Sequence, residues 1–104
     1  MSAGRRVGGV MPRAIAGALR QVGALAQSEG MQAYLVGGAV RDLLLGKPNL
    51  DLDVAVLGDA IALGRRVARQ FSGELIAHGQ LGTATVQVGK MRMDLATARA
   101  EEYP

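Results

Sequence analysis

Two aspartates separated by one residue, Asp51 and Asp53, have the spacing best suited to chemistry in this chain. Leu52, Val54 and Val56 alternate with them, which is typical of a strand with one apolar face and one acidic face. Residues i and i+2 of a strand lie on the same face, about 6–7 Å apart. Carboxylates held that close repel one another unless a cation lies between them, so the pair favours a hard metal ion such as Mg²⁺.

A glycine pair lies shortly before these acids. Gly37 and Gly38 follow the short apolar strand predicted over Tyr34–Val36 and precede a short helix predicted over Ala39–Leu45. Backbone N–H groups at such a turn can approach phosphate oxygens because glycine has no side chain. Arg41 falls one helical turn beyond Gly38, so its guanidinium can reach the same anion. A phosphate cradle beside a metal pair predicts phosphoryl or nucleotidyl transfer.

Asp42, which follows that arginine, has two possible roles. It can orient Arg41 or a substrate hydroxyl, or it can support the short helix near its positively polarised N-terminal end. The residue types leave both roles open. Each motif alone is also typical of ordinary structure, a glycine turn or a solvated strand face. Their combination at this spacing is what indicates function.

The rest of the chain supplies the elements that must position these residues. Apolar residues at 3–4 spacing predict a helix that starts at Pro12 and stops near Gly30. A second helix is predicted from its cap at Asp59 through Phe71, with Gly73 as its stop. The remaining strands are predicted over Glu74–Ala77, Thr83–Val88 and Met91–Ala96, the last two joined by a tight turn at Gly89-Lys90. This order predicts an α+β fold, a mixed sheet with helices packed on one face.

Length and composition limit the class of protein. A chain of 104 residues forms one domain, predicted over 12–104 and preceded by a flexible basic arm over 1–11. The net charge of +3 lies in residues 1–30, which favours a solubilising arm over a nucleic-acid-binding face. The absence of cysteine excludes a disulfide framework and a thiolate metal site and favours the cytoplasm. No apolar run approaches the ~20 residues that span a bilayer, so no membrane partner is expected.

Several motifs, taken together, resemble a known family. Residues 34–46 and the segment Asp51-Leu52-Asp53-Val54 resemble the head-domain signature of class II tRNA nucleotidyltransferases, the CCA-adding enzymes, which bacterial poly(A) polymerases share. The resemblance continues in residues 82–86, 93–99 and 102–103 and covers roughly 12–104. It implies a polymerase-β-like nucleotidyltransferase head.

The resemblance also implies roles for individual residues. Asp51 and Asp53 correspond to the acids that hold two Mg²⁺ ions, one acting on the RNA 3′-hydroxyl and one on the triphosphate and leaving pyrophosphate. Gly38 and Arg41 match positions that contact the triphosphate. Asp94 falls where the wider superfamily often places a third carboxylate, although it could equally be an ordinary strand acid.

The nucleotide-binding segment implied in this way comprises Gly37, Gly38, Arg41 and Asp42. The implied activity is Mg²⁺-dependent transfer of a nucleotide from CTP or ATP to an RNA 3′ end, above all CCA addition to tRNA. A poly(A) polymerase head is an alternative within the family. A non-catalytic or split nucleotide-binding fragment that needs a second chain is an alternative of another class. A small stand-alone nucleotidyltransferase fits less well, because those proteins usually carry a Gly-Ser pair at this place.

Two departures from the family pattern matter. Leu81 occupies a position that is often aromatic, which we interpret as a packing variation. The chain also ends at Pro104, before the motifs that handle the ribose and select the base, so the resemblance implies a truncated head. Most contacts with RNA are then expected outside this chain. An exposed sheet edge is expected as well, through which the head could associate with a partner.

Overall fold

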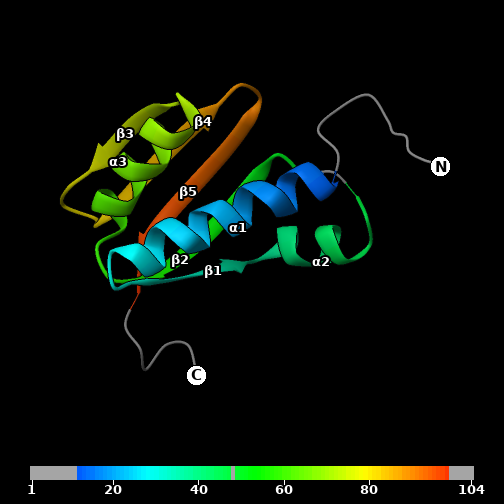
Figure 1. Cartoon of the computed structure of the whole chain (residues 1–104), viewed down its shortest axis with the longest axis horizontal. Coiled ribbons are helices and arrows are strands. Elements are labelled where there is room, and N and C mark those ends of the chain that lie inside the picture. The colour runs from blue at the N-terminus through cyan, green and yellow to red at the C-terminus, as the bar shows by residue number, and fades with distance from the viewer. Residues whose placement is uncertain (1–11, 48, 99–104) are drawn as a thin grey trace.

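The computed structural model describes residues 12–47 and 49–98; the predicted arm over 1–11 lies outside them (Figure 1). Within the described residues, helices and strands alternate up to the third helix, and three consecutive strands follow. In order they are α1 (Pro12–Ser28), β1 (Gln32–Val36), α2 (Gly38–Leu44), β2 (Asp51–Leu57), α3 (Ala60–Phe71), β3 (Glu74–His78), β4 (Thr83–Val88) and β5 (Met91–Thr97). Every predicted element is confirmed, with boundaries that differ by two residues at most.

The five strands form one mixed sheet in the order β1-β2-β5-β4-β3. The pairs β1·β2, β4·β5 and β3·β4 are antiparallel, whereas β2 and β5 are parallel. The chain therefore leaves β2, passes through α3 and two further strands, and returns to add β5 beside β2. This return places a strand from the end of the chain against the acidic strand near its middle.

Helices α1 and α3 cover one face of the sheet (Figure 1). The apolar face of β2, formed by Leu52, Val54 and Val56, is almost completely buried there. Met93 and Leu95 of β5 are buried on the same side, because they alternate with Arg92 and Asp94 as the strand period requires. The predicted α+β fold with helices on one face is thus confirmed, and the acidic residues lie on the face opposite the helices.

The ends of α3 show one confirmed and one corrected prediction. Asp59 caps the helix as predicted, since its Oδ1 accepts hydrogen bonds from the N–H groups of Ile61 and Ala62 at 3.1 Å. The helix ends at Phe71, and its C-cap Ser72 adopts the left-handed conformation (φ 54°), so the prediction that Gly73 supplies this stop is wrong. Gly73 is required for space instead, because a Cβ there would lie 2.7 Å from the carbonyl oxygen of Gln87.

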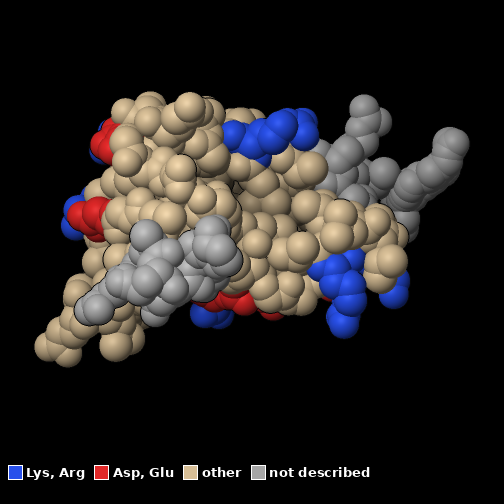
Figure 2. All heavy atoms as spheres, turned by 90° about the horizontal axis from the view of Figure 1, so that it is seen from below, with Lys and Arg blue, Asp and Glu red and all other residues tan. Residues whose placement is uncertain are grey.

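The edges and surface of the sheet complete the fold. Strands β1 and β3 form its two edges, and each exposes one large apolar side chain, Tyr34 and Ile76. The association through an edge that the sequence predicted is untested and stays a prediction. On the described part of the face seen in Figure 2, Lys and Arg side chains are interspersed with Asp and Glu and form no single basic patch. No helix among the described residues is long and apolar enough to cross a membrane.

Candidate active site

The antiparallel pairing of β1 with β2 brings the glycine turn to the acidic strand. Val36, the last residue of β1, pairs with Asp53. Gly37 follows with φ 78° and ψ −160°, a backbone conformation that residues with a Cβ rarely adopt. A Cβ on Gly37 would lie 3.6 Å from Oδ2 of Asp53. The backbone of the turn therefore passes directly beside this carboxylate, as the spacing of the two motifs predicted.

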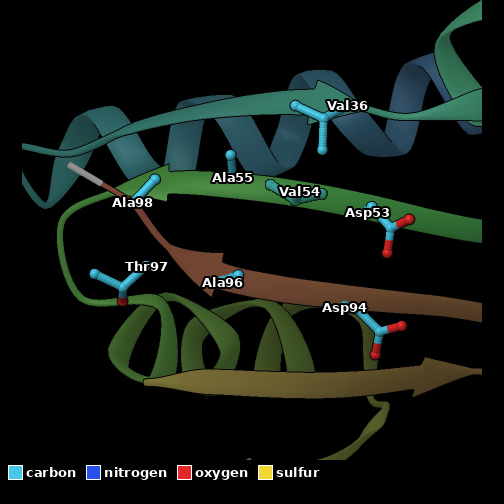
Figure 3. Close-up of a pocket in the computed structure, with 8 residues that line it drawn as sticks. All are labelled: Val36, Asp53, Val54, Ala55, Asp94, Ala96, Thr97 and Ala98. Atoms are coloured by element: carbon cyan, nitrogen blue, oxygen red, sulfur yellow. The ribbon is translucent and has the colours of Figure 1, made fainter. Parts of the chain in front are cut away.

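The parallel pairing of β2 with β5 brings a further carboxylate to the same place. Asp53 pairs with Asp94, and Asp51 pairs with Arg92. Paired residues of neighbouring strands extend to the same face of a sheet, and Figure 3 shows the side chains of Asp53 and Asp94 side by side on adjacent strands. The position implied for a third carboxylate is thus occupied by Asp94, although its role is not tested by this placement.

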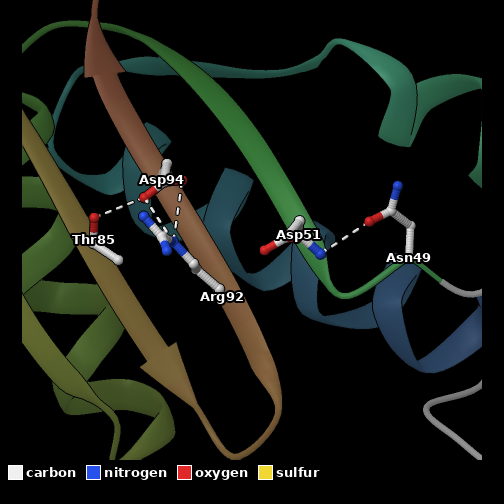
Figure 4. A network of polar contacts seen from close by, with 5 residues as sticks. All are labelled: Asn49, Asp51, Thr85, Arg92 and Asp94. Carbon is white, nitrogen blue, oxygen red and sulfur yellow. Dashed lines mark hydrogen bonds and ion pairs between the residues drawn. The ribbon is translucent and has the colours of Figure 1, made fainter.

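Asp94 is already held by two neighbours on its face of the sheet (Figure 4). The Thr85 hydroxyl of β4 donates a hydrogen bond to Asp94 Oδ1 at 2.6 Å. The Nε of Arg92 lies 3.4 Å from the same oxygen and 3.3 Å from Oδ2. These contacts fix the carboxylate beside Asp53 and place a positive charge close to it.

The residues of α2 are linked to the start of β2 by a short series of contacts. Arg41 Nε lies 3.6 Å from Asp42 Oδ1, and the arginine side chain is 75% exposed. Asn49 Nδ2 donates a hydrogen bond to Asp42 Oδ2 at 2.8 Å. Asn49 Oδ1 in turn accepts one from the backbone N–H of Asp51 at 2.9 Å. Asp42 therefore contacts Arg41, and its role in orienting that side chain stays a prediction.

A hollow of about 550 Å³ opens on the sheet beside the carboxylates (Figure 3). It lies over β1, β2 and β5, and its wall is formed mostly by small residues. Its lining consists of Val36, Asp53, Val54, Ala55, Asp94, Ala96, Thr97 and Ala98. The volume lies within the range of about 300–1,000 Å³ found for small-molecule sites. Asp53 and Asp94 thus border a space large enough for part of a nucleotide.

Three residues of this site were not predicted from the sequence: Asn49, Thr85 and Arg92. Thr85 and Arg92 could have been placed on the acidic face by strand alternation, since each lies between two buried residues of its own strand. Their contacts with Asp94 depend on the pairing register, which alternation does not give. Asn49 lies in a connection, where no periodic signal exists.

The comparisons with known proteins show the family to which this chain belongs. The family profile described as the poly A polymerase head domain matches residues 33–104. The A-adding tRNA nucleotidyltransferase of Aquifex aeolicus is 45% identical over 74 residues, 71% of this chain and 9% of the relative. The enzyme of the same name from Halalkalibacterium halodurans is 41% identical over 86 residues, 82% of this chain and 20% of the relative. The chain thus spans a fifth or less of the length of these curated relatives.

Solved structures show the same fold. A structure titled tRNA-processing enzyme (apo form I) superposes with a TM-score of 0.78 at 38% identity, over 96% of this chain and 26% of that chain. A CCA-adding enzyme solved in complex with ATP superposes with a TM-score of 0.77 at 39% identity, over 89% of this chain and 22% of that chain. The fold thus defines a nucleotidyltransferase head.

This chain belongs to the family of the poly A polymerase head domain, whose members include tRNA nucleotidyltransferases. The predicted resemblance is confirmed, and with it the assignment to an enzyme family.

Proposed function

We propose that this chain is the catalytic head of a Mg²⁺-dependent nucleotidyltransferase that extends the 3′ end of tRNA from ATP or CTP. One observation carries the proposal: the sheet places Asp53 opposite Asp94 and beside the backbone of Gly37. Carboxylates on neighbouring strands next to an open glycine turn are suited to hold a metal together with phosphate oxygens. Residues that are 41 positions apart in the sequence meet there only because β5 returns to β2.

The residues present fit Mg²⁺ as a metal that arrives with its nucleotide. Among the described residues, no group of three or more His, Cys, Asp or Glu side chains is gathered closely enough to hold a metal by itself. Mg²⁺ commonly uses one or two carboxylates and completes its octahedron with water and substrate phosphates. Asp51 and Asp53 would supply those carboxylates, with Asp94 as a neighbour. When bound, the ion lowers the pKa of the attacking hydroxyl and neutralises charge on the triphosphate.

The residues of α2 complement the charge of the triphosphate. The guanidinium of Arg41 is exposed and therefore accessible to a phosphate oxygen. Helix α2 has only seven residues, so we assign the attraction mainly to this charge and to the backbone of Gly37 and Gly38 rather than to a helix dipole. The carboxylate of Asp42 restrains the guanidinium from one side.

The substrate assignment is supported by the relatives and not by this chain alone. The curated relatives are named A-adding tRNA nucleotidyltransferases, and one solved relative is a complex with ATP. We expect contacts with tRNA to lie mostly in segments outside this chain, because the chain spans a fifth or less of the length of these relatives. The cytoplasm remains the predicted location.

A titration of the chain with ATP and CTP, followed by ¹⁵N–¹H NMR with and without Mg²⁺, tests this function. We expect Mg²⁺-dependent shifts at Gly38, Arg41 and Asp53, and a loss of nucleotide affinity of tenfold or more in Asp53→Asn, because that variant removes a metal-binding charge. Glu74→Gln makes the same chemical change on the edge strand β3 and should bind as wild type. Mg²⁺-dependent binding that survives both Asp51→Asn and Asp53→Asn would contradict the metal assignment.

A further inference from the structure

Asn49 uses both ends of its carboxamide to join two parts of the site. Nδ2 donates to Asp42 Oδ2 at 2.8 Å, and Oδ1 accepts from the N–H of Asp51 at 2.9 Å. An amide nitrogen only donates and an amide oxygen only accepts, so the reversed amide would satisfy neither partner. Only the orientation in which both bonds form is therefore compatible with these neighbours (Figure 4 shows the bond to Asp51).

These contacts form a continuous path from the exposed arginine to the acidic strand. Arg41 is 75% exposed, whereas the side chain of Asp42 is only 22% exposed and lies between Arg41 and Asn49. Each oxygen of the Asp42 carboxylate faces one of these neighbours. Asn49 also fixes the N–H of the residue that begins β2. A displacement of Asn49 would thus change the positions of both Asp42 and Asp51.

We propose that Asn49 is a positioning residue that keeps the triphosphate-binding arginine at a fixed distance from the metal-binding strand. This inference rests on the proposed function, because it assigns Arg41 to the nucleotide and Asp51 to the metal. Its physical basis is that a charged acceptor and a neutral donor make a stronger hydrogen bond than two neutral groups. The described residues of the connection, 45–47 and 49–50, form no helix or strand that could hold these elements in register.

A double-mutant cycle at positions 42 and 49 tests whether Asn49 acts through its hydrogen bond to Asp42. Asn49→Asp keeps an acceptor for the N–H of Asp51 but replaces the donor to Asp42 with a repelling carboxylate. We expect it to weaken binding of Mg²⁺–ATP about tenfold. In an Asp42→Asn background the same substitution should cost less than twofold, because the new amide at position 42 can donate to the new carboxylate at position 49.

The control and a second variant separate positioning from folding. Gln70→Glu makes the same amide-to-carboxylate change between α3 and α1, where Gln70 contacts Gln21, and should leave Mg²⁺–ATP binding unchanged. Asn49→Ser removes the donor to Asp42 without adding charge, while its hydroxyl can still accept from the N–H of Asp51. Asn49→Ser should weaken binding of Mg²⁺–ATP about threefold and leave the thermal midpoint of unfolding unchanged. This variant replaces Asn49→Asp in the test if Asn49→Asp fails to fold.

The inference would be overturned if Asn49→Asp reduced the affinity for Mg²⁺–ATP equally in the two backgrounds, or in neither. If the wild-type chain binds no Mg²⁺–ATP, the proposed function fails for this chain, and the positioning is then judged from backbone amide shifts. Amide shift changes at residues 38–45 in Asn49→Asp that are absent in the Asp42→Asn background support the positioning role. Amide resonances of residues 38–45 that keep their wild-type positions in Asn49→Asp would overturn the inference. The two failures are therefore distinguishable.

Discussion

At the scale of single residues, the two aspartates of β2 on the acidic face pair with residues of β5 that differ in charge. Asp53 pairs with Asp94, whereas Asp51 pairs with Arg92, and Arg92 also contacts Asp94. One guanidinium therefore contacts Asp94 and belongs to the residue paired with Asp51. A cation at that place offsets the repulsion of these carboxylates when no metal is bound, and it competes with a metal when one arrives.

We expect Arg92→Gln to bind Mg²⁺ about three- to fivefold more tightly than wild type, because it removes a competing positive charge. The effect is limited by solvent, since the Arg92 side chain is 53% exposed and exposed pairs contribute about 1 kcal/mol or less. A calorimetric Mg²⁺ titration at low ionic strength measures it.

Arg69→Gln, a charge loss on the helical layer, is the control for that titration and should change the Mg²⁺ affinity little. Weaker Mg²⁺ binding in Arg92→Gln would contradict the competition. It would indicate instead that Arg92 is needed to hold Asp94 in a metal-binding orientation.

The site residues that could be predicted are those indicated by the sequence pattern of a single strand or turn. Asp51 and Asp53 were predicted because alternation along one strand is enough to put both on one face. Asn49 was not predicted, because it lies in irregular chain, where no periodic signal indicates its contacts with Asp42 in α2 and Asp51 in β2. The partners of Asp94 required a pairing register that one strand does not encode.

At the scale of elements, the close approach of α3 to the sheet depends on Gly64. A glycine inside a helix weakens the sequence signal for that helix, yet the helix forms through this position. A Cβ on Gly64 would lie 2.9 Å from the Cβ of Ala84 and 3.2 Å from Cδ1 of Leu75. The glycine is therefore used for helix–sheet packing, a reason that the local sequence does not reveal.

Gly64→Ala should destabilise the fold by about 1–2 kcal/mol, because the cost of overpacking exceeds the gain in helix propensity. Gly23→Ala in α1 is the matched control: a Cβ there meets nothing within 4 Å, so the same substitution should stabilise by about 0.5–1 kcal/mol. Denaturation by urea gives both free energies of unfolding. Equal effects of the two substitutions would refute the packing role of Gly64.

At the scale of the whole molecule, the order of the strands creates the site. The sequence predicted the number of strands, the hairpin of β4 and β5, and the side covered by helices, since all of these follow from local periodicity and turn residues. It did not predict that β5 inserts between β2 and β4. That placement follows from burying Met93 and Leu95 under the helices, which is a property of the assembled core. It is also what brings Asp94 to Asp53.

The central claim is that a divalent metal and a nucleotide meet on the open face of this sheet. Paramagnetic broadening by Mn²⁺ in the presence of ATP tests it most directly, because Mn²⁺ accepts the same oxygen ligands as Mg²⁺ and broadens only nearby resonances. We predict broadening of the amides at 37–38, 51–53 and 93–94, and its loss in Asp53→Asn. Broadening centred elsewhere, or the same broadening in Asp53→Asn, would contradict the account.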